Sequence, residues 1–275
     1  MAPTSMPAEH WSAVADAWDH NTEYINSHSV AATEALVDAV GVQPGDQLLE
    51  LAAGPGTLGG RWSELVGRTG RVVISDIAPG MVETARRRNT NLGNVEVEVL
   101  DASSIDCPDA SFDVVVSRMG LMFTPDPAVA FGETRRVLAA GGRFVALTWA
   151  GMEHNPWMTC VGMAAMMNGL VAGGPPVGPG GIFSLGDPAL LVALAKDAAF
   201  VDVAVEEIPA TFHAESIDTH IERSAWLACC WRQALSSLAG GQYGSDGGVR
   251  QPRVEAWSTR VRVARATIGR VSSAR

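Results

Sequence analysis

One stretch decides the fold: residues 48–60 read LLELAAGPGTLGG. It passes from an apolar run that is typical of a buried strand, through a glycine-rich turn, into a helix expected at about 58–66. Glycines let the backbone approach a ligand closely, and the first turn of a helix offers free N–H groups to an anion. The stretch therefore predicts a ligand site at the end of a strand.

Further apolar runs follow this stretch, separated by segments of helical spacing. Together the runs cover residues 47–52, 71–75, 95–100, 112–117 and 142–148. Runs that are apolar on both faces are typical of a parallel sheet covered by helices on each side. Because crossover connections between parallel strands are right-handed, a doubly wound α/β sheet is the favoured architecture.

The segments on either side of these runs are different in character. Helical spacing of apolar residues covers 11–18 and 29–40, so we expect N-terminal helices. After Trp149 five methionines crowd a predicted helix, and GGPPVGPGG follows at 173–181, which indicates an insertion. Helical or strand patterns resume at 187–199, 201–208 and 211–239.

The chain is accordingly divided by function. We expect N-terminal helices over 1–43 as a cover, a ligand-binding core over 44–150 and a lid insertion over 151–186. Residues 187–239 complete the core and add a helical segment. Residues 240–275 carry seven arginines and form a basic tail, with a weak last strand at about 254–263.

Composition excludes several classes of function. The 275 residues include 30 acidic and 20 basic side chains, a net charge of −10, so no affinity for nucleic acid or anionic membranes is expected. The chain has no run of 18 apolar residues and no signal-peptide pattern at its N-terminus. Its four cysteines have neither metal-ligand nor disulfide spacing, so we expect reduced thiols, no metal site and a cytoplasmic protein.

The glycine pattern alone leaves the ligand open. Gly54, Gly56 and Gly59 satisfy the dinucleotide-binding spacing, and Asp76 lies twenty residues beyond Gly56. The same pattern fits a nicotinamide cofactor and S-adenosylmethionine.

Three carboxylates favour S-adenosylmethionine. Glu50 ends the first run, where it suits a cationic ammonium group and would repel a pyrophosphate. Asp76 ends the second run and can accept both ribose hydroxyls, and Asp101 ends the third, where it can accept the adenine amino group. Acids on consecutive strand ends describe a ligand with an amino-acid end, a diol and an aminopurine.

The ordered motifs resemble those of class I S-adenosylmethionine-dependent methyltransferases, and most closely the ubiquinone/menaquinone-biosynthesis group. The matching motifs are ELAAGPG (50–56), DIAPGMVETAR (76–86), DA (101–102), FDVV (112–115) and RVLAAGGR (136–143). This resemblance implies a Rossmann-like, seven-stranded fold that binds S-adenosylmethionine and releases S-adenosylhomocysteine. The cofactor-binding residues expected are Glu50, Ala52, Gly54, Gly56, Asp76, Ile77, Met81, Asp101, Ala102 and Ser117.

Two departures from the family pattern stand out. Ala52 replaces the first glycine that is usual in the turn, and its methyl group is expected to narrow the approach to the ligand. The tail after Gly240 follows the usual last strand poorly, which puts the final hairpin of the sheet in doubt.

The acceptor and the chemistry are less sharply defined by the sequence. His154 is the best candidate for a general base, although an acidic acceptor needs none. Met122, Trp149, Trp157 and Phe183 suggest a small hydrophobic or aromatic acceptor. The sequence leaves a homodimer open. Rival readings are an NAD(P)-dependent oxidoreductase, for which no tyrosine–lysine pair is apparent, and a catalytically inactive S-adenosylmethionine-binding scaffold.

Overall fold

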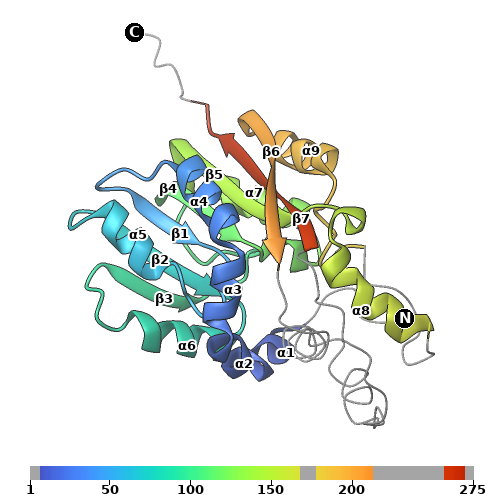
Figure 1. Ribbon diagram of the computed structural model, residues 1–275. Coiled ribbons are helices and arrows are strands. Elements are labelled where there is room, and N and C mark those ends of the chain that lie inside the picture. Colours follow the sequence, from blue (N-terminus) through green and yellow to red (C-terminus); the bar gives the residue numbers. More distant parts are fainter. Residues whose placement is uncertain (1–6, 168–177, 213–256, 270–275) are drawn as a thin grey trace.

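A seven-stranded sheet forms the centre of the molecule in the computed structural model, which describes residues 7–167, 178–212 and 257–269 (Figure 1). Its strand order is β3-β2-β1-β4-β5-β7-β6. The first five strands pair in parallel, and β7 runs antiparallel to both β5 and β6. The predicted doubly wound, mostly parallel sheet is confirmed. Its strands are β1 (Gln47–Glu50), β2 (Arg71–Asp76), β3 (Val95–Val99), β4 (Phe112–Arg118), β5 (Leu138–Trp149), β6 (Val201–Phe212) and β7 (Trp257–Thr267).

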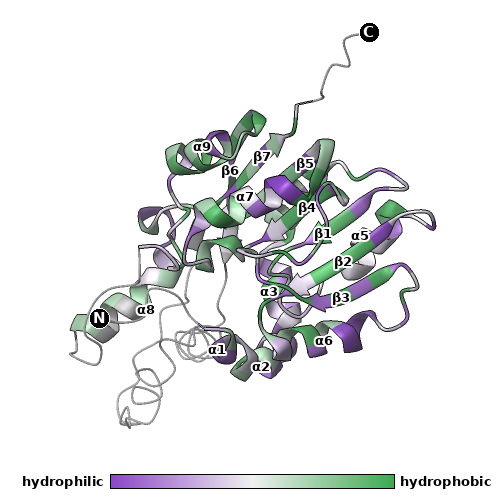
Figure 2. Ribbon diagram, turned by 180° about the vertical axis from the view of Figure 1, so that it is seen from behind, coloured by the Kyte–Doolittle hydropathy of each residue, from purple (hydrophilic) through white to green (hydrophobic). Residues whose placement is uncertain are grey.

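Helices cover both faces of this sheet, as its apolar strands require. One buried cluster joins α4, α5 and α6 to one face, and a second joins α7 and α9 to the other. In Figure 2 the central strands are largely hydrophobic, whereas the end of α6 is hydrophilic. The helices are α1 (Ala8–Ala13), α2 (Ala15–His20), α3 (Thr22–His28), α4 (Val30–Val40), α5 (Gly59–Val66), α6 (Pro79–Asn89), η1 (Leu121–Phe123), α7 (Pro127–Val137), η2 (Met152–His154), α8 (Pro156–Met167) and α9 (Pro188–Asp197).

The register of the parallel strands brings their carboxyl ends to one edge of the sheet. Glu50 pairs with Ile74 of β2 on one side and with Val116 of β4 on the other. Asp76, at the end of β2, pairs with Val99 at the end of β3. Ligands of doubly wound sheets bind at this edge, near the point where the strand order reverses. Here the order reverses between β1 and β4.

The N-terminal helices lie against the same edge (Figure 1). Val14 and Ala15 are buried with Ala78 and Met81 of α6, and Trp11 and Trp18 pack against this cluster. The helices predicted over 11–18 and 29–40 are confirmed, but the first is divided between α1 and α2, and α3 lies between the two predicted stretches. The breaks let the segment bend around the start of α6.

Three boundaries differ from those predicted. β5 begins at Leu138 rather than at 142, because Leu138 pairs with Phe112 before an irregularity that contains Gly141. β6 continues to Phe212, so the helix predicted from 211 does not begin there, and its remainder to 239 lies outside the described residues. The doubted last strand exists as β7, and it ends at Thr267, four residues beyond its predicted end.

Candidate functional site

The glycine turn between β1 and α5 requires its glycines. Gly54 and Gly56 have φ angles of 56° and 66°, a left-handed conformation that glycine adopts without steric cost. A Cβ on Gly56 would also lie 2.8 Å from the Ala85 Cβ and 2.9 Å from the Asn89 Nδ2. The turn is therefore packed closely against α6, and its other side faces the strand ends.

Ala52, which stands where the resemblance predicts a glycine, has a left-handed conformation with a φ of 51°. Its methyl group lies against Gly120, where a Cβ would collide with both the Ala52 Cβ and its carbonyl oxygen. Met119 is also left-handed, with a φ of 59°. Such residues cost about 1–3 kcal/mol each and cluster at functional sites. Here two of them follow the neighbouring strands β1 and β4.

Glu50 is buried at the end of β1, with 2% of its surface exposed. Its Oε2 accepts a hydrogen bond of 3.0 Å from the indole Nε1 of Trp62 in α5. Burial raises the pKa of Glu50 to about 7, against the opposing effects of the Arg118 charge and the Trp62 hydrogen bond. A buried carboxyl group with so few donors is suited to receive a cation.

Asp76 connects the end of β2 to the glycine turn. Its Oδ2 accepts a 2.8 Å hydrogen bond from the Gly54 N–H, and its Oδ1 accepts one of 2.9 Å from the Ala78 N–H. Burial raises the pKa of Asp76, while these backbone donors lower it. Because a carboxylate offers about four acceptor positions, Asp76 retains capacity for ligand hydroxyls.

The other residues expected to bind the cofactor lie around the same edge. Asp101 is exposed just after β3, and its Oδ1 accepts a 2.7 Å hydrogen bond from the Ser103 N–H. Ala102 is buried beside it, with 8% of its surface exposed. Ile77 follows Asp76 and is 41% exposed, whereas Met81 is buried in the cluster with α1 and α2.

Ser117 and Arg118 end β4. The Ser117 side chain is buried and its Oγ has no hydrogen-bond partner among the described residues. Arg118, which the sequence analysis did not single out, donates to Asn26 of α3, Thr33 of α4 and Thr57 of the glycine turn. Arg118 is half-buried, and two of these three partners lie on N-terminal helices 85–92 residues away in sequence. Only the fold reveals it, because an arginine after a strand resembles a surface residue.

The residues expected to contact the acceptor come from several elements near the end of β5. Trp149 and Trp157 form an edge-to-face pair with ring centroids 5.6 Å apart, and Phe183 is 6% exposed. Met122 is fully buried in the core cluster of the α7 face. His154 lies in η2 with its side chain 38% exposed, and its Nε2 is 3.4 Å from the Glu153 Oε1.

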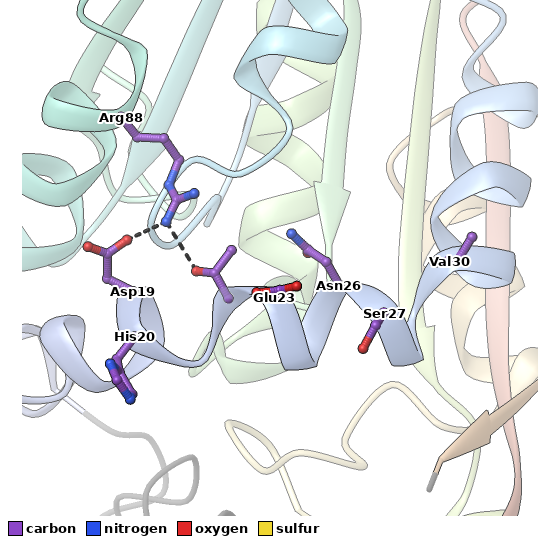
Figure 3. Close-up of a pocket in the computed structure, with 8 residues that line it drawn as sticks. Asp19, His20, Glu23, Asn26, Ser27, Val30 and Arg88 are labelled. Atoms are coloured by element: carbon purple, nitrogen blue, oxygen red, sulfur yellow. Dashed lines mark hydrogen bonds and ion pairs between the residues drawn. The ribbon is translucent and has the colours of Figure 1, made fainter.

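A pocket of about 610 Å³ lies on the N-terminal helices, between them and α6 (Figure 3). Arg88 of α6 donates to Asp19 and Thr22 across it. Asn26, the residue that accepts from Arg118, also lines the pocket, so it lies beside the strand-end site. The lining residues are Asp19, His20, Thr22, Glu23, Asn26, Ser27, Val30 and Arg88.

The described part of the chain has neither a metal-binding cluster nor a membrane-spanning helix. No group of three or more His, Cys, Asp or Glu residues there could hold a metal ion. No helix in that part is long and apolar enough to cross a membrane.

Comparison with known proteins identifies the region that carries this site. Residues 49–146 match the family model described as a methyltransferase domain. A ubiquinone/menaquinone biosynthesis C-methyltransferase from Pseudoalteromonas translucida is 36% identical over 117 residues, which are 42% of this chain and 47% of that protein. An uncharacterized 37.1 kDa protein of a Streptomyces fradiae transposon is 43% identical over 110 residues, which are 40% of this chain and 32% of that protein. The chain thus spans less than half the length of these relatives.

Solved structures share the fold over more of the chain. A putative methyltransferase from Bacillus halodurans superimposes with a TM-score of 0.60 and 16% identity, covering 86% of this chain and 98% of that one. Phosphoethanolamine N-methyltransferase 2 from Haemonchus contortus, solved with S-adenosylhomocysteine, gives a TM-score of 0.54 and 18% identity. It covers 86% of this chain and 52% of that one.

Proposed function

We propose that this chain, whose residues 49–146 form a class I methyltransferase domain similar to that of the ubiquinone/menaquinone-biosynthesis enzymes, methylates a small molecule with S-adenosylmethionine. The observation that carries the proposal is the set of acids on neighbouring strand ends. Glu50 and Asp76 are the last residues of β1 and β2, and Asp101 follows β3 at the same edge of the sheet, beside the glycine turn.

Each part of the cofactor has a matching group at this edge. The ammonium group would bind Glu50, and the methionine part would lie along Ala52, Gly54 and Gly56. The ribose hydroxyls would bind Asp76. The adenine would lie between Ile77, Met81 and Ala102, with its amino group at Asp101, and the reactive methyl group would face Ser117.

The reaction is an in-line displacement at the methyl carbon. A lone pair of the acceptor forms the new bond to the methyl carbon as the carbon–sulfur bond breaks. The electron pair of the broken bond stays on sulfur and neutralises the sulfonium. An acceptor proton leaves for solvent or for a base. Alignment of the two reactants alone can contribute up to about 7–11 kcal/mol. Exclusion of water adds to this effect, because charge is neutralised as the bond forms.

The acceptor proposed is hydrophobic or aromatic, on the evidence of the apolar rings near the end of β5. Trp149, Trp157 and Phe183 would line it, and Met122 would lie behind them. His154 would serve as a base only for an acceptor of low acidity. We propose that residues 1–43 cover the site and that residues 151–186 act as a lid. We also propose that the protein works in the cytoplasm without a nucleic-acid partner. A homodimer is compatible with this function.

Calorimetry with two ligands tests the proposal against its rivals. S-Adenosylhomocysteine should bind with one-to-one stoichiometry, and NADPH should not bind. Binding of NADPH alone would instead support an oxidoreductase. Transfer of a labelled methyl group is then measured over a panel of phenols and activated carbon acids. Binding of S-adenosylhomocysteine without transfer to any acceptor would favour an inactive scaffold.

A further inference from the structure

Arg118 is a half-buried charge that the proposed function leaves without a role. Its guanidinium lies where four elements meet: β4, the glycine turn, α3 and α4. The hydrogen bonds run from Nη1 to Asn26 Oδ1 at 3.2 Å and to Thr33 Oγ1 at 3.3 Å, and from Nη2 to Thr57 Oγ1 at 2.5 Å. All three acceptors are neutral.

No carboxylate of the described residues lies within ion-pair distance of Arg118. Burial lowers its pKa, and the charge of Glu50, which is not in contact with it, raises the pKa. Burying a cation without an anionic partner is costly, and proteins normally pair such charges. A half-buried arginine without an anionic partner among the described residues is therefore suited to an anion that arrives with a ligand.

The guanidinium still has donors to offer. Five N–H groups are available on an arginine, and three are used here, so the Nε–H and one Nη2 hydrogen have no acceptor among the described residues. Elsewhere in this protein the same two nitrogens of Arg71 hold the Glu96 carboxylate, at 2.8 and 2.5 Å. A carboxylate can bind Arg118 in the same manner.

The register places Arg118 on the same face of the sheet as Glu50. Glu50 pairs with Val116 in the parallel ladder, and side chains two residues apart on a strand point to the same face. The face that buries Val114 and Val116 with α4 and α5 therefore ends in one acid, from β1, and one cation, from β4. An amino-acid zwitterion has the opposite charges to this pair.

We propose that Arg118 binds the α-carboxylate of the cofactor's amino-acid end while Glu50 binds its ammonium group. This inference rests on the proposed function. It adds a residue outside the glycine turn to those that orient the cofactor. Thr57, Asn26 and Thr33 then act as positioning residues, because they hold the guanidinium at the strand end. The same contacts join the N-terminal helices to the glycine turn. Binding of the carboxylate would therefore also affect the position of these helices, which are proposed to cover the site.

Two other roles for Arg118 make different predictions. A purely structural arginine would tie the helices to the glycine turn and would affect every ligand of the site equally. An arginine that binds a carboxylate of the acceptor would affect the KM of the acceptor and leave binding of the product cofactor unchanged.

The test pairs a change in the protein with a change in the ligand. Calorimetry measures S-adenosylhomocysteine and its decarboxylated analogue with the wild-type protein, Arg118→Gln and Arg118→Lys. The wild type should bind the analogue about 10- to 100-fold more weakly, the range typical of a hydrogen bond to a charged group. Arg118→Gln should lose affinity for S-adenosylhomocysteine by a similar factor and lose less than about threefold for the analogue. The affinity of Arg118→Lys for S-adenosylhomocysteine should lie between those of the wild type and Arg118→Gln.

Arg61→Gln is the matched control, since Arg61 forms an exposed ion pair with Glu34 at 2.8 Å and should leave both affinities unchanged. Equal losses for both ligands in Arg118→Gln would overturn the proposal in favour of a structural role. Unchanged binding of S-adenosylhomocysteine with a raised acceptor KM would overturn it in favour of the acceptor. If Arg118→Gln fails to fold, the wild type decides alone, because equal affinity for the two ligands contradicts the proposal.

Failure of the inference is distinguishable from failure of the proposed function. A wild-type protein that binds neither ligand contradicts the proposed function itself. One that binds both ligands equally retains the function and excludes Arg118 as the carboxylate anchor.

Discussion

Glu50 gives the unliganded protein a carboxyl group that is about half protonated at neutral pH, because its pKa is raised to about 7. The groups that face it are the Arg118 charge and the Trp62 indole N–H. An ammonium ligand favours the ionised form and lowers this pKa. Binding therefore releases a proton below pH 7, and affinity for S-adenosylhomocysteine should rise with pH between 5.5 and 7.

The rise should approach tenfold per pH unit at its steepest. Titration calorimetry in buffers of different ionisation enthalpy measures both the affinity and the proton released. Glu50→Gln should bind more weakly and lose this pH dependence. A wild-type affinity that is flat over the same range would show that no ammonium group binds Glu50.

Asp76 holds the glycine turn and is proposed to hold the ribose. Asp76→Ala should therefore weaken binding of S-adenosylhomocysteine at least about tenfold, since it removes a charge-assisted contact. The melting temperature should fall as well, because Gly54 and Ala78 lose the acceptor of their N–H groups. A variant with unchanged affinity would remove Asp76 from the site.

At the scale of elements, the junction of β1 and β4 depends on close contact between Ala52 and Gly120. Gly120→Ala would place a methyl group against Ala52 and should reduce the free energy of unfolding by about 1–3 kcal/mol. Gly132→Ala is the control, because a Cβ there meets nothing within 4 Å and Gly132 lies inside helix α7. That variant should be as stable as the wild type or more stable. Urea denaturation measures both, and equal stabilities would show that the junction is loosely packed.

The strands of the sheet were predictable because burial on both faces requires runs of consecutive apolar residues, which are visible in the sequence. β1, β2 and β4 each have an apolar centre, and the predicted runs end within two residues of the observed strand ends. β7 was harder to place, since Arg260 and Arg262 look like a solvated basic tail. In the fold both arginines pair with Glu207 of β6, so their charges are compensated across the hairpin.

Arg118 shows why the site was predicted only in part. The three acids follow apolar runs, so their residue type and position in the sequence are informative. The hydrogen-bond partners of Arg118 come from α3, α4 and the glycine turn. No local sequence pattern predicts contacts between segments so far apart in the chain. The same reason applies to the strain at Met119, which only the backbone angles reveal.

For the molecule as a whole, Arg262 joins the last strand to the segment proposed as a lid. Its side chain is 8% exposed, and it donates to the Gly186 carbonyl and pairs with Glu207 at 3.1 Å. Arg262→Gln should reduce the free energy of unfolding by about 1.5–3 kcal/mol, the range for hydrogen bonds to charged groups. Arg71→Gln should cost under about 1 kcal/mol, because its pair with Glu96 is exposed. Similar costs in chemical denaturation would show that Arg262 does not hold the hairpin to residues near 186.

We propose that acids from three strands bind one nucleoside–amino-acid ligand at a single edge of the sheet. A crystal structure with S-adenosylhomocysteine bound measures this most directly. We expect the ribose hydroxyls at Asp76, the adenine amino group at Asp101, the ammonium group at Glu50 and the carboxylate at Arg118. A nucleoside bound elsewhere, or side chains that contact no part of it, would contradict the proposed cofactor site.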